Sequence, residues 1–277
     1  MAVFTVALTQ TCSGIDVEKN IDAVAELVRR AAGEGAELVC TPETTSLMAR
    51  NRSELFEAIV PEDEDRALAA MRALAKEERV WLLVGSLEVL ASSTHAANRS
   101  FLLDPAGDIR ARYDKIHLFD VTLPGGEYYR ESEICRAGGE VVVAQTPLGV
   151  MGMSVCYDLR FPGLYRELAR RGADFLTVPS AFTHQTGSAH WHILLRARAI
   201  ENGCFVFAPG QAGHHENGKH TYGHSLVVDP WGRILAEGGE SAGEIITARI
   251  DTDEVARARG HIPVLQHERK LAGELVL

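Results

Sequence analysis

The chain has 277 residues, of which 46% are hydrophobic and 24% charged, and a formal net charge of −10. This composition is close to that of an average globular protein and excludes a disordered chain, a coiled coil and a collagen-like fibre. The negative charge disfavours nucleic acids and anionic membrane surfaces as partners, and no apolar run reaches the roughly 18 residues that a membrane-spanning helix needs.

The first half of the chain alternates apolar runs with stretches of helical spacing. Residues 3–8 form an apolar strand, and the apolar residues between Ile21 and Ala31 recur at helical spacing behind Asp16, the predicted N-cap. Asp104-Pro-Ala-Gly107 has proline and glycine where a type I turn favours them, which predicts a hairpin. The other predicted elements are a strand at 37–41, a helix at 65–78, a strand at 80–86 and the hairpin strands at 101–103 and 109–113.

The second half repeats this order. Two segment pairs are similar along their length: GAELVCTPE with GADFLTVPS, and LLDPAGDIRA with VVDPWGRILA. Although α/β units look alike in general, two matches in the same order favour a pseudo-duplicated α/β domain. We predict a single domain over residues 1–277, with sheets packed inside and helices outside. The predicted elements are strands at 150–155, 174–178, 204–208, 226–228 and 234–236, and helices at 161–171 and 190–202.

Three chemically active side chains follow predicted strands, where α/β proteins place their sites. Glu43, Lys115 and Cys156 each stand just beyond an apolar or hairpin strand. At a strand-to-helix junction a cysteine is expected to have a stabilised thiolate. A carboxyl in a partly dry site is expected to have a raised pKa and to act as a general base, and an ammonium stabilises an oxyanion. Each of the three residues, considered alone, has an alternative interpretation without a catalytic role. Cys156 is then an inert cysteine, Glu43 an exposed loop glutamate and Lys115 a surface lysine.

Around these residues the sequence resembles the nitrilase superfamily of carbon–nitrogen hydrolases. The Glu–Lys–Cys triad of that family matches Glu43 in TPETT, Lys115 in YDKIHLFD and Cys156 in GMSVCYDLRFP, and its second glutamate matches Glu131 in YRESE. The resemblance covers nearly the whole chain. It implies a four-layer α-β-β-α sandwich with two pseudo-symmetric halves, assembled as a homodimer or larger homo-oligomer, with the tail at about 261–277 in the subunit interface.

Within the superfamily, the segments at 179–202 and 211–225 most resemble the deaminated glutathione amidase branch. That branch implies hydrolysis of a small carboxylate-bearing primary amide to an acid and ammonia through a thioester. The alternatives are an ω-amidase acting on α-ketoglutaramate, an N-carbamoyl amino acid hydrolase, a nitrilase and, outside the enzyme class, a catalytically silent binding partner. The triplet Thr183-His184-Gln185 departs from both amidase branches, which leaves the substrate open.

The resemblance also implies a role for each site residue. Glu43 takes the proton of Cys156 and returns it to the leaving group, and Lys115 with the backbone N–H of Tyr157 holds the oxyanion. Glu131 hydrogen-bonds the lysine or the substrate and fixes the geometry. Two residues have a structural alternative to substrate contact: Trp191 packs in the interior, or Arg160 anchors the nucleophile turn. The residues predicted to contact substrate are Phe182, Thr183, His190, Trp191 and Arg160.

A metal site and a histidine base are further alternatives. His214, His215, His220 and His224 lie close together, but they lack the HExxH spacing and no cysteine joins them, so a polar loop at the pocket is favoured. No signal nominates a histidine beside Cys156. The five cysteines are widely spaced without a CxxC pair, which argues against a disulfide framework or zinc ribbon and predicts a cytoplasmic protein. We expect no metal and no cofactor, and a small-molecule amide as the ligand.

Overall fold

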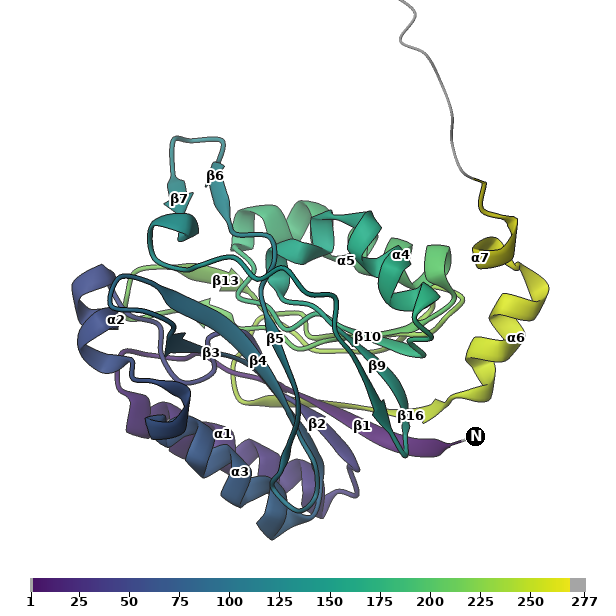
Figure 1. Ribbon diagram of the computed structural model, residues 1–277, viewed down its shortest axis with the longest axis horizontal. Coiled ribbons are helices and arrows are strands. Elements are labelled where there is room, and N and C mark those ends of the chain that lie inside the picture. The colour runs from purple at the N-terminus through teal and green to yellow at the C-terminus, as the bar shows by residue number, and fades with distance from the viewer. Residues whose placement is uncertain (1, 270–277) are drawn as a thin grey trace, which may run out of the picture.

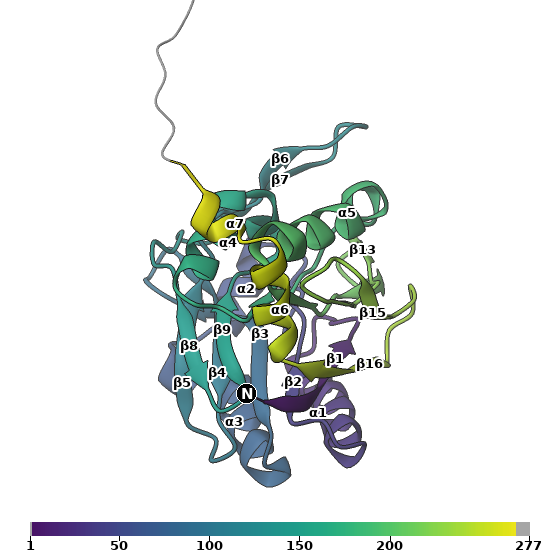
Figure 2. The same cartoon turned by 90° about the vertical axis from the view of Figure 1, so that its right-hand side faces the viewer.

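Two six-stranded sheets lie face to face in the centre of the molecule, with helices on both outer sides (Figures 1 and 2). The computed structural model describes residues 2–269. From one outer side of the molecule to the other, the layers are helix, sheet, sheet and helix, which confirms the α-β-β-α sandwich. No helix within residues 2–269 combines the length and the apolar character needed to cross a membrane.

The two sheets have the same internal order, and this confirms the repeated halves. In each, three parallel strands are followed by two antiparallel ones, and one more antiparallel strand pairs with the first. The first sheet contains β16 (Glu244–Asp251), β1 (Val3–Gln10), β2 (Leu38–Cys40), β3 (Trp81–Leu90), β4 (Ala96–Leu103) and β5 (Ile109–Asp114). The second contains β15 (Ile234–Glu237), β14 (Leu226–Val228), β11 (Phe205–Ala208), β10 (Phe175–Thr177), β9 (Gly149–Met153) and β8 (Val143–Thr146).

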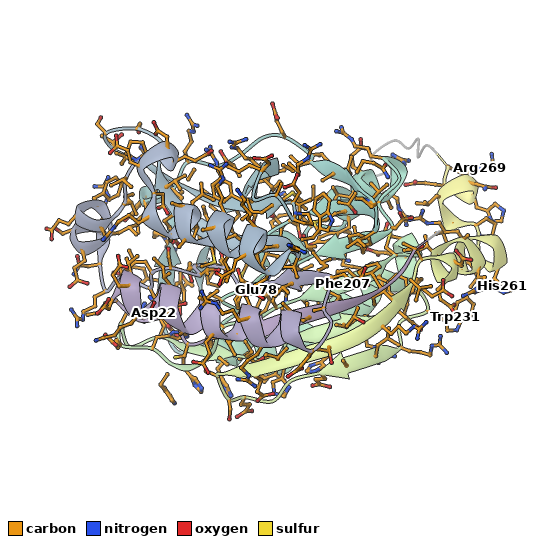
Figure 3. The ribbon with its side chains drawn as sticks, turned by 90° about the horizontal axis from the view of Figure 1, so that it is seen from below. Asp22, Glu78, Phe207, Trp231, His261 and Arg269 are labelled. Carbon is orange, nitrogen blue, oxygen red and sulfur yellow. The ribbon has the colours of Figure 1, made fainter. Side chains whose placement is uncertain are left out.

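Each sheet is covered by one pair of long helices. The helices α1 (Val17–Gly33) and α3 (Arg66–Glu78) run side by side over the first sheet, as Figure 3 shows from below. Both begin at predicted positions, because Asp16 accepts from the Lys19 amide and Asp65 from the Leu68 amide. The helices α4 (Pro162–Arg170) and α5 (His184–Asn202) cover the second sheet.

The helix α5 begins six residues before the predicted start, so that prediction was wrong. Thr183 caps it by accepting a hydrogen bond from the Thr186 amide at 3.4 Å. Gly187 lies so close to the Tyr222 ring that a Cβ there would sit 2.3 Å from it. The first turns are therefore held by a cap and a tertiary contact, neither of which produces apolar periodicity in the sequence.

Several short or polar elements were not predicted. They are α2 (Arg52–Ala58), β6 (Asp120–Thr122), β7 (Tyr128–Arg130), β12 (Ala212–His214), β13 (His220–Tyr222), β16, β8, α6 (Asp253–His261) and α7 (Val264–His267). Of the tail placed at 261–277, residues 270–277 lie outside the described residues. Its place at a subunit interface, like the homo-oligomer itself, stays a prediction.

Gly85 sets the spacing between the two halves beside the segment that carries Glu43. A Cβ at this position would lie 1.9 Å from the Thr41 oxygen, 2.5 Å from the Pro42 oxygen and 2.6 Å from the Pro179 ring. The Gly85 amide also donates to the Thr41 hydroxyl at 2.9 Å. Strand glycines mark such close backbone approaches.

Replacing Gly85 by alanine is therefore expected to lower the free energy of unfolding by about 2 kcal/mol or more, because backbone atoms must move apart. Urea unfolding monitored by circular dichroism measures this. Gly163→Ala is the matched control, since a Cβ on Gly163 meets nothing within 4 Å. Equal effects of the two substitutions would contradict the proposed close contact.

Candidate active site

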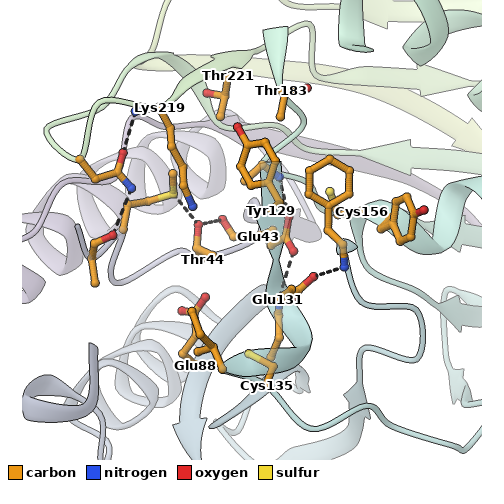
Figure 4. A pocket seen from close by; sticks show the side chains of 18 of the residues that line it. Glu43, Thr44, Glu88, Tyr129, Glu131, Cys135, Cys156, Thr183, Lys219 and Thr221 are labelled. Carbon is orange, nitrogen blue, oxygen red and sulfur yellow. Dashed lines mark hydrogen bonds between the residues drawn. The ribbon is translucent and has the colours of Figure 1, made fainter. Parts of the chain in front are cut away.

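Strand ends from both sheets meet at one cavity of about 240 Å³. Glu43 follows β2, Lys115 follows β5 and Cys156 follows β9, and all three line this cavity. Glu131 lines it from the 3₁₀ turn η2 (Glu131–Glu133). The structure thus brings together the four residues that the sequence nominated from positions far apart in the chain, and Figure 4 labels Glu43, Glu131 and Cys156 among them.

Lys115 is held between two carboxylates. Its Nζ donates to Glu43 Oε1 at 2.8 Å and to Glu131 Oε1 and Oε2 at 3.0 and 2.9 Å. The side chain is only 2% exposed. Burial by itself lowers the pKa of Lys115, but the charges of Glu131 and Glu43 raise it well above its ordinary value. The ammonium is therefore a permanent cation of the site.

Glu43 is an ionised acceptor with several donors around it. Besides Lys115, Asn98 Nδ2 donates to Oε1 at 2.9 Å and the Ala181 amide donates to Oε2 at 2.7 Å. Burial favours a higher pKa, but the Lys115 charge and the hydrogen bonds from Lys115 and the Ala181 amide lower the pKa of Glu43 below its ordinary value. The raised pKa expected from the sequence was wrong, because a cation in direct contact outweighs burial.

Cys156 is a thiol and not the thiolate expected from its place at a strand-to-helix junction. Burial and the neighbouring Glu43 carboxylate raise its pKa well above the ordinary value, and Lys115 opposes this rise only in part. The thiol lies within hydrogen-bonding reach of Glu43. Any nucleophilic use of this sulfur therefore needs a base, and Glu43 is in position.

The turn that carries Cys156 is sharp. Cys156 has a φ of +48°, which side chains rarely adopt, and its amide donates to the Pro179 oxygen at 2.9 Å. Tyr157 is the second residue of η3 (Cys156–Arg160), where a backbone N–H has no acceptor within the helix. Such backbone strain is common where a functional residue must be exposed to a ligand.

Asp158 holds this turn against the loop that follows Lys115, and sequence reasoning missed it. Its buried carboxylate accepts from the Val155 amide at 2.9 Å, from Tyr113 Oη at 2.6 Å and from the His117 amide at 3.0 Å. Asp158 thereby fixes the lysine segment relative to the cysteine segment. The sequence feature that could have identified Asp158 is its position two residues after Cys156.

Two amide side chains that were also missed hold Glu43 in place, one at its carboxylate and the other at its backbone. Asn98 Nδ2 reaches both Glu43 Oε1 and Glu131 Oε1, the latter at 3.2 Å. Gln211 Nε2 donates to the Glu43 carbonyl oxygen at 2.9 Å. Both side chains are buried. A single buried Asn or Gln gives no sequence pattern that would have identified it.

Of the predicted substrate contacts, Phe182 and Thr183 line the cavity, whereas His190, Trp191 and Arg160 do not. Trp191 is fully buried, packs against Phe182 and donates its indole N–H to the His224 oxygen at 2.8 Å. The exposed His190 bonds to Arg160, whose guanidinium lies over the Phe182 ring. Trp191 therefore has the packing role that the sequence offered as its alternative, whereas substrate contact by His190 and Arg160 stays a prediction.

Arg198, and not Arg160, anchors the nucleophile turn. Its Nη2 and Nε donate to the Leu159 oxygen at 2.8 and 3.0 Å. Its Nη1 pairs with Glu201 at 2.9 Å, as their spacing on the helix suggested. A buried guanidinium bound twice to one carbonyl is a rigid support for the turn.

The histidine-rich segment forms the hairpin β12–β13, which confirms a polar loop at the pocket. Lys219, His220 and Thr221 line the cavity. Elsewhere in residues 2–269, His192, His224 and Glu237 place their donor atoms within 4.8 Å of one another. Glu237 Oε1 bonds to both imidazoles, at 2.8 and 2.9 Å, so hydrogen bonding accounts for this cluster.

Comparisons with known proteins agree with this geometry. A family model described as carbon–nitrogen hydrolase matches residues 5–260. The deaminated glutathione amidase of Yersinia enterocolitica is 41% identical over 268 residues, which cover 95% of this chain and 92% of that protein.

Two solved structures are similar along almost the whole chain. The NitFhit protein of C. elegans matches with a TM-score of 0.90 and 39% identity over 97% of this chain, and the chain spans 66% of that protein. Nit3 of Saccharomyces cerevisiae, a member of branch 10 of the nitrilase superfamily, matches with a TM-score of 0.85 and 31% identity over 95% of each chain.

Lys115→Met is expected to lower the free energy of unfolding by about 3–5 kcal/mol at pH 7, because it leaves two buried carboxylates without their cation. Urea titrations measure the loss. This loss of stability should become smaller as the pH falls below about 4.5. In the wild type the lowered pKa of Glu43 contributes stability above its ordinary pKa of 4.5, and this contribution is lost as the pH falls further. The double variant Lys115→Met/Glu131→Gln should recover part of the loss, and no recovery would contradict the shared ion pair.

Proposed function

The chain belongs to the carbon–nitrogen hydrolase family and is an amidase, and we propose that it works through a covalent thioester on Cys156. The observation that carries this proposal is the Lys115 ammonium fixed between Glu43 and Glu131, in the same cavity as a buried thiol. These groups supply a nucleophile, a base and a fixed positive charge, which together are what acyl transfer requires.

In the first half of the proposed reaction, Glu43 takes the proton of the Cys156 thiol as the sulfur attacks the amide carbon. The carbonyl oxygen becomes an oxyanion, which Lys115 and the Tyr157 backbone N–H stabilise. Glu43 then returns the proton to the amide nitrogen, the C–N bond breaks and the amine leaves. The acyl group remains on sulfur as a thioester.

In the second half, Glu43 takes a proton from water while the water oxygen attacks the thioester carbon. The same two donors stabilise the second oxyanion. Its collapse breaks the C–S bond, the proton on Glu43 returns to sulfur, and the acid leaves. One carboxylate thus acts as base and acid in turn, for which an ionised resting state is the correct starting point.

Glu131 is proposed as a positioning residue. Both of its oxygens accept from Lys115, and Oε2 also accepts from the Phe119 amide at 2.6 Å. With its acceptors occupied in this way, it holds the lysine and leaves proton transfer to Glu43. Glu131→Gln should therefore act mainly through the placement of Lys115.

For the substrate we propose a linear amide with a carboxylate on its acyl part. Support comes from relatives named deaminated glutathione amidase and from the cations at the cavity, Arg50, Arg130 and Lys219. Deaminated glutathione has no primary amide: its 2-oxo acyl group is joined to cysteinylglycine by a secondary amide. Hydrolysis there releases an amine, so the ammonia expected from the sequence would come only from primary amides such as α-ketoglutaramate.

Cys156→Ala should abolish amide hydrolysis, by at least about a thousandfold, while leaving the circular dichroism spectrum unchanged. The assay follows amine release from deaminated glutathione and ammonia release from α-ketoglutaramate. Cys12→Ala is the matched control, because Cys12 is exposed and does not line the cavity. In the wild type, mass spectrometry after a rapid acid quench should find an acyl adduct on Cys156. Turnover by pure Cys156→Ala protein would overturn the proposal.

A further inference from the structure

One carboxyl at the cavity has no part in the proposed mechanism. Glu88 belongs to β3 and lines the cavity. Its Oε2 is buried and has no hydrogen-bond partner anywhere in the described part of the chain. Buried polar atoms are almost always paired, because an unpaired one costs free energy. An unpaired oxygen in the wall of a binding cavity is therefore a natural partner for a ligand.

The groups around Glu88 keep its proton in place at neutral pH. Glu43 after β2, Glu131 on η2, the Cys135 thiol and Lys219 on the β12–β13 hairpin all interact with it. Burial and, to a smaller extent, the Glu43 and Glu131 charges raise the pKa of Glu88 to about 8, with Lys219 opposing the rise. At pH 7 the carboxyl is uncharged and can donate a hydrogen bond.

Lys219 is the cation that faces this carboxyl. In Figure 4 it reaches into the pocket from the hairpin, and Glu88 points into the pocket from the opposite side. Arg50 is paired with Glu54, and Arg130 donates to the Val121 and Tyr129 carbonyl oxygens. Lys219 forms no ion pair with any residue between 2 and 269. Its Nζ lies 5.7 Å from the centre of the Tyr129 ring.

We propose that Lys219 and Glu88 together recognise the acyl end of the substrate: Lys219 pairs with its carboxylate, and the Glu88 carboxyl donates a hydrogen bond to an uncharged oxygen next to that carboxylate. This inference rests on the proposed amidase function. The group that fits is a 2-oxo carboxylate. A 2-amino acid presents an ammonium in place of the oxo oxygen, and an uncharged carboxyl that donates its proton is a poor partner for a cation.

Three amides that differ by one group each separate the two contacts. α-Ketoglutaramate has the 2-oxo group and the carboxylate, glutaramate lacks the oxo group, and butyramide lacks both. Lys219→Met should raise KM about tenfold or more for the first two and leave butyramide unchanged, because a charge-assisted hydrogen bond is lost. Lys76→Met, an exposed lysine on α3, is the matched control and should change none of the three.

Glu88 is tested with two variants. Glu88→Ala should raise KM about tenfold for α-ketoglutaramate and leave glutaramate and butyramide unchanged, with kcat retained throughout. Glu88→Gln keeps a donor and should stay within about threefold of the wild type at pH 7. The butyramide rate reports whether each variant is folded and chemically competent.

The pH dependence gives a readout that a merely structural role would not produce. Above about pH 8, Glu88 loses its proton, so it no longer donates and repels the nearby carboxylate. The wild-type KM for α-ketoglutaramate should therefore rise between pH 7.5 and 9, whereas that of Glu88→Gln should not. Taking the ratio of the two enzymes at each pH cancels any change in the substrate itself.

These experiments distinguish a failure of the recognition proposal from a failure of the amidase proposal. If no amide is hydrolysed in a Cys156-dependent way, the proposed function fails. If hydrolysis persists but Glu88→Ala and Lys219→Met raise KM equally for all three amides, or for none, the recognition proposal is overturned and the amidase proposal stands. Selective hydrolysis of glutamine over α-ketoglutaramate by the wild type would also overturn it.

Discussion

The site depends on one ammonium group shared by two buried carboxylates. Moving charges out of water is costly, and only close pairing with good hydrogen bonds offsets the loss. Lys115 meets this condition for both Glu43 and Glu131 at distances near 2.9 Å. Burial, together with the net negative charge of these three groups, makes the adjacent Cys156 keep its proton. The proposed transfer of that proton to Glu43 therefore moves negative charge from one atom to another without adding any to the cavity.

This arrangement constrains the whole fold, because its members come from both sheets. Glu43 and Lys115 follow strands of the first sheet, and Cys156 follows a strand of the second. The two sheets must therefore meet at a fixed distance, which Gly85 permits by allowing close approach to Pro179. Asp158 then joins the loop after β5 to the cysteine turn. The strained φ of Cys156 persists because these contacts fix the segments on either side of it.

Elements with a strong local pattern could be predicted from the sequence, and those that depend on tertiary contacts could not. Buried parallel strands such as β2 and β10 are apolar runs, and their repetition revealed the two halves. The edge strand β16 and the hairpin β12–β13 are partly polar, and the first turns of α5 contain glycine and histidine. These segments gain their structure from pairing or packing with distant residues, which leaves no periodicity to detect.

The same distinction applies within the site. Glu43, Lys115 and Cys156 could be nominated because strand ends are where α/β proteins place reactive groups. Asn98 and Gln211 were missed because their contacts with Glu43 cross 55 and 168 residues of sequence. The pKa directions of Glu43 and Cys156 were wrong for a related reason. The place of a residue on a strand or helix indicates the direction of one contribution to its pKa. The net pKa shift also depends on which charged side chains contact the residue, and the sequence does not show this.

A net charge of −10 is compatible with the anionic substrate that we propose, because local charges dominate in the cavity. Charges farther away than about 8–10 Å are screened at physiological ionic strength, so the cavity responds mainly to its own side chains. There, an uncharged Glu88 adds no repulsion, and Lys219 is not neutralised by an acidic partner within residues 2–269. In the proposed reaction the chemistry comes from residues that follow β2, β5 and β9, and the proposed recognition comes from the β12–β13 hairpin and from β3. The identity of the substrate is therefore harder to predict from the composition and the repeated sequence pattern than the fold or the reactive residues are.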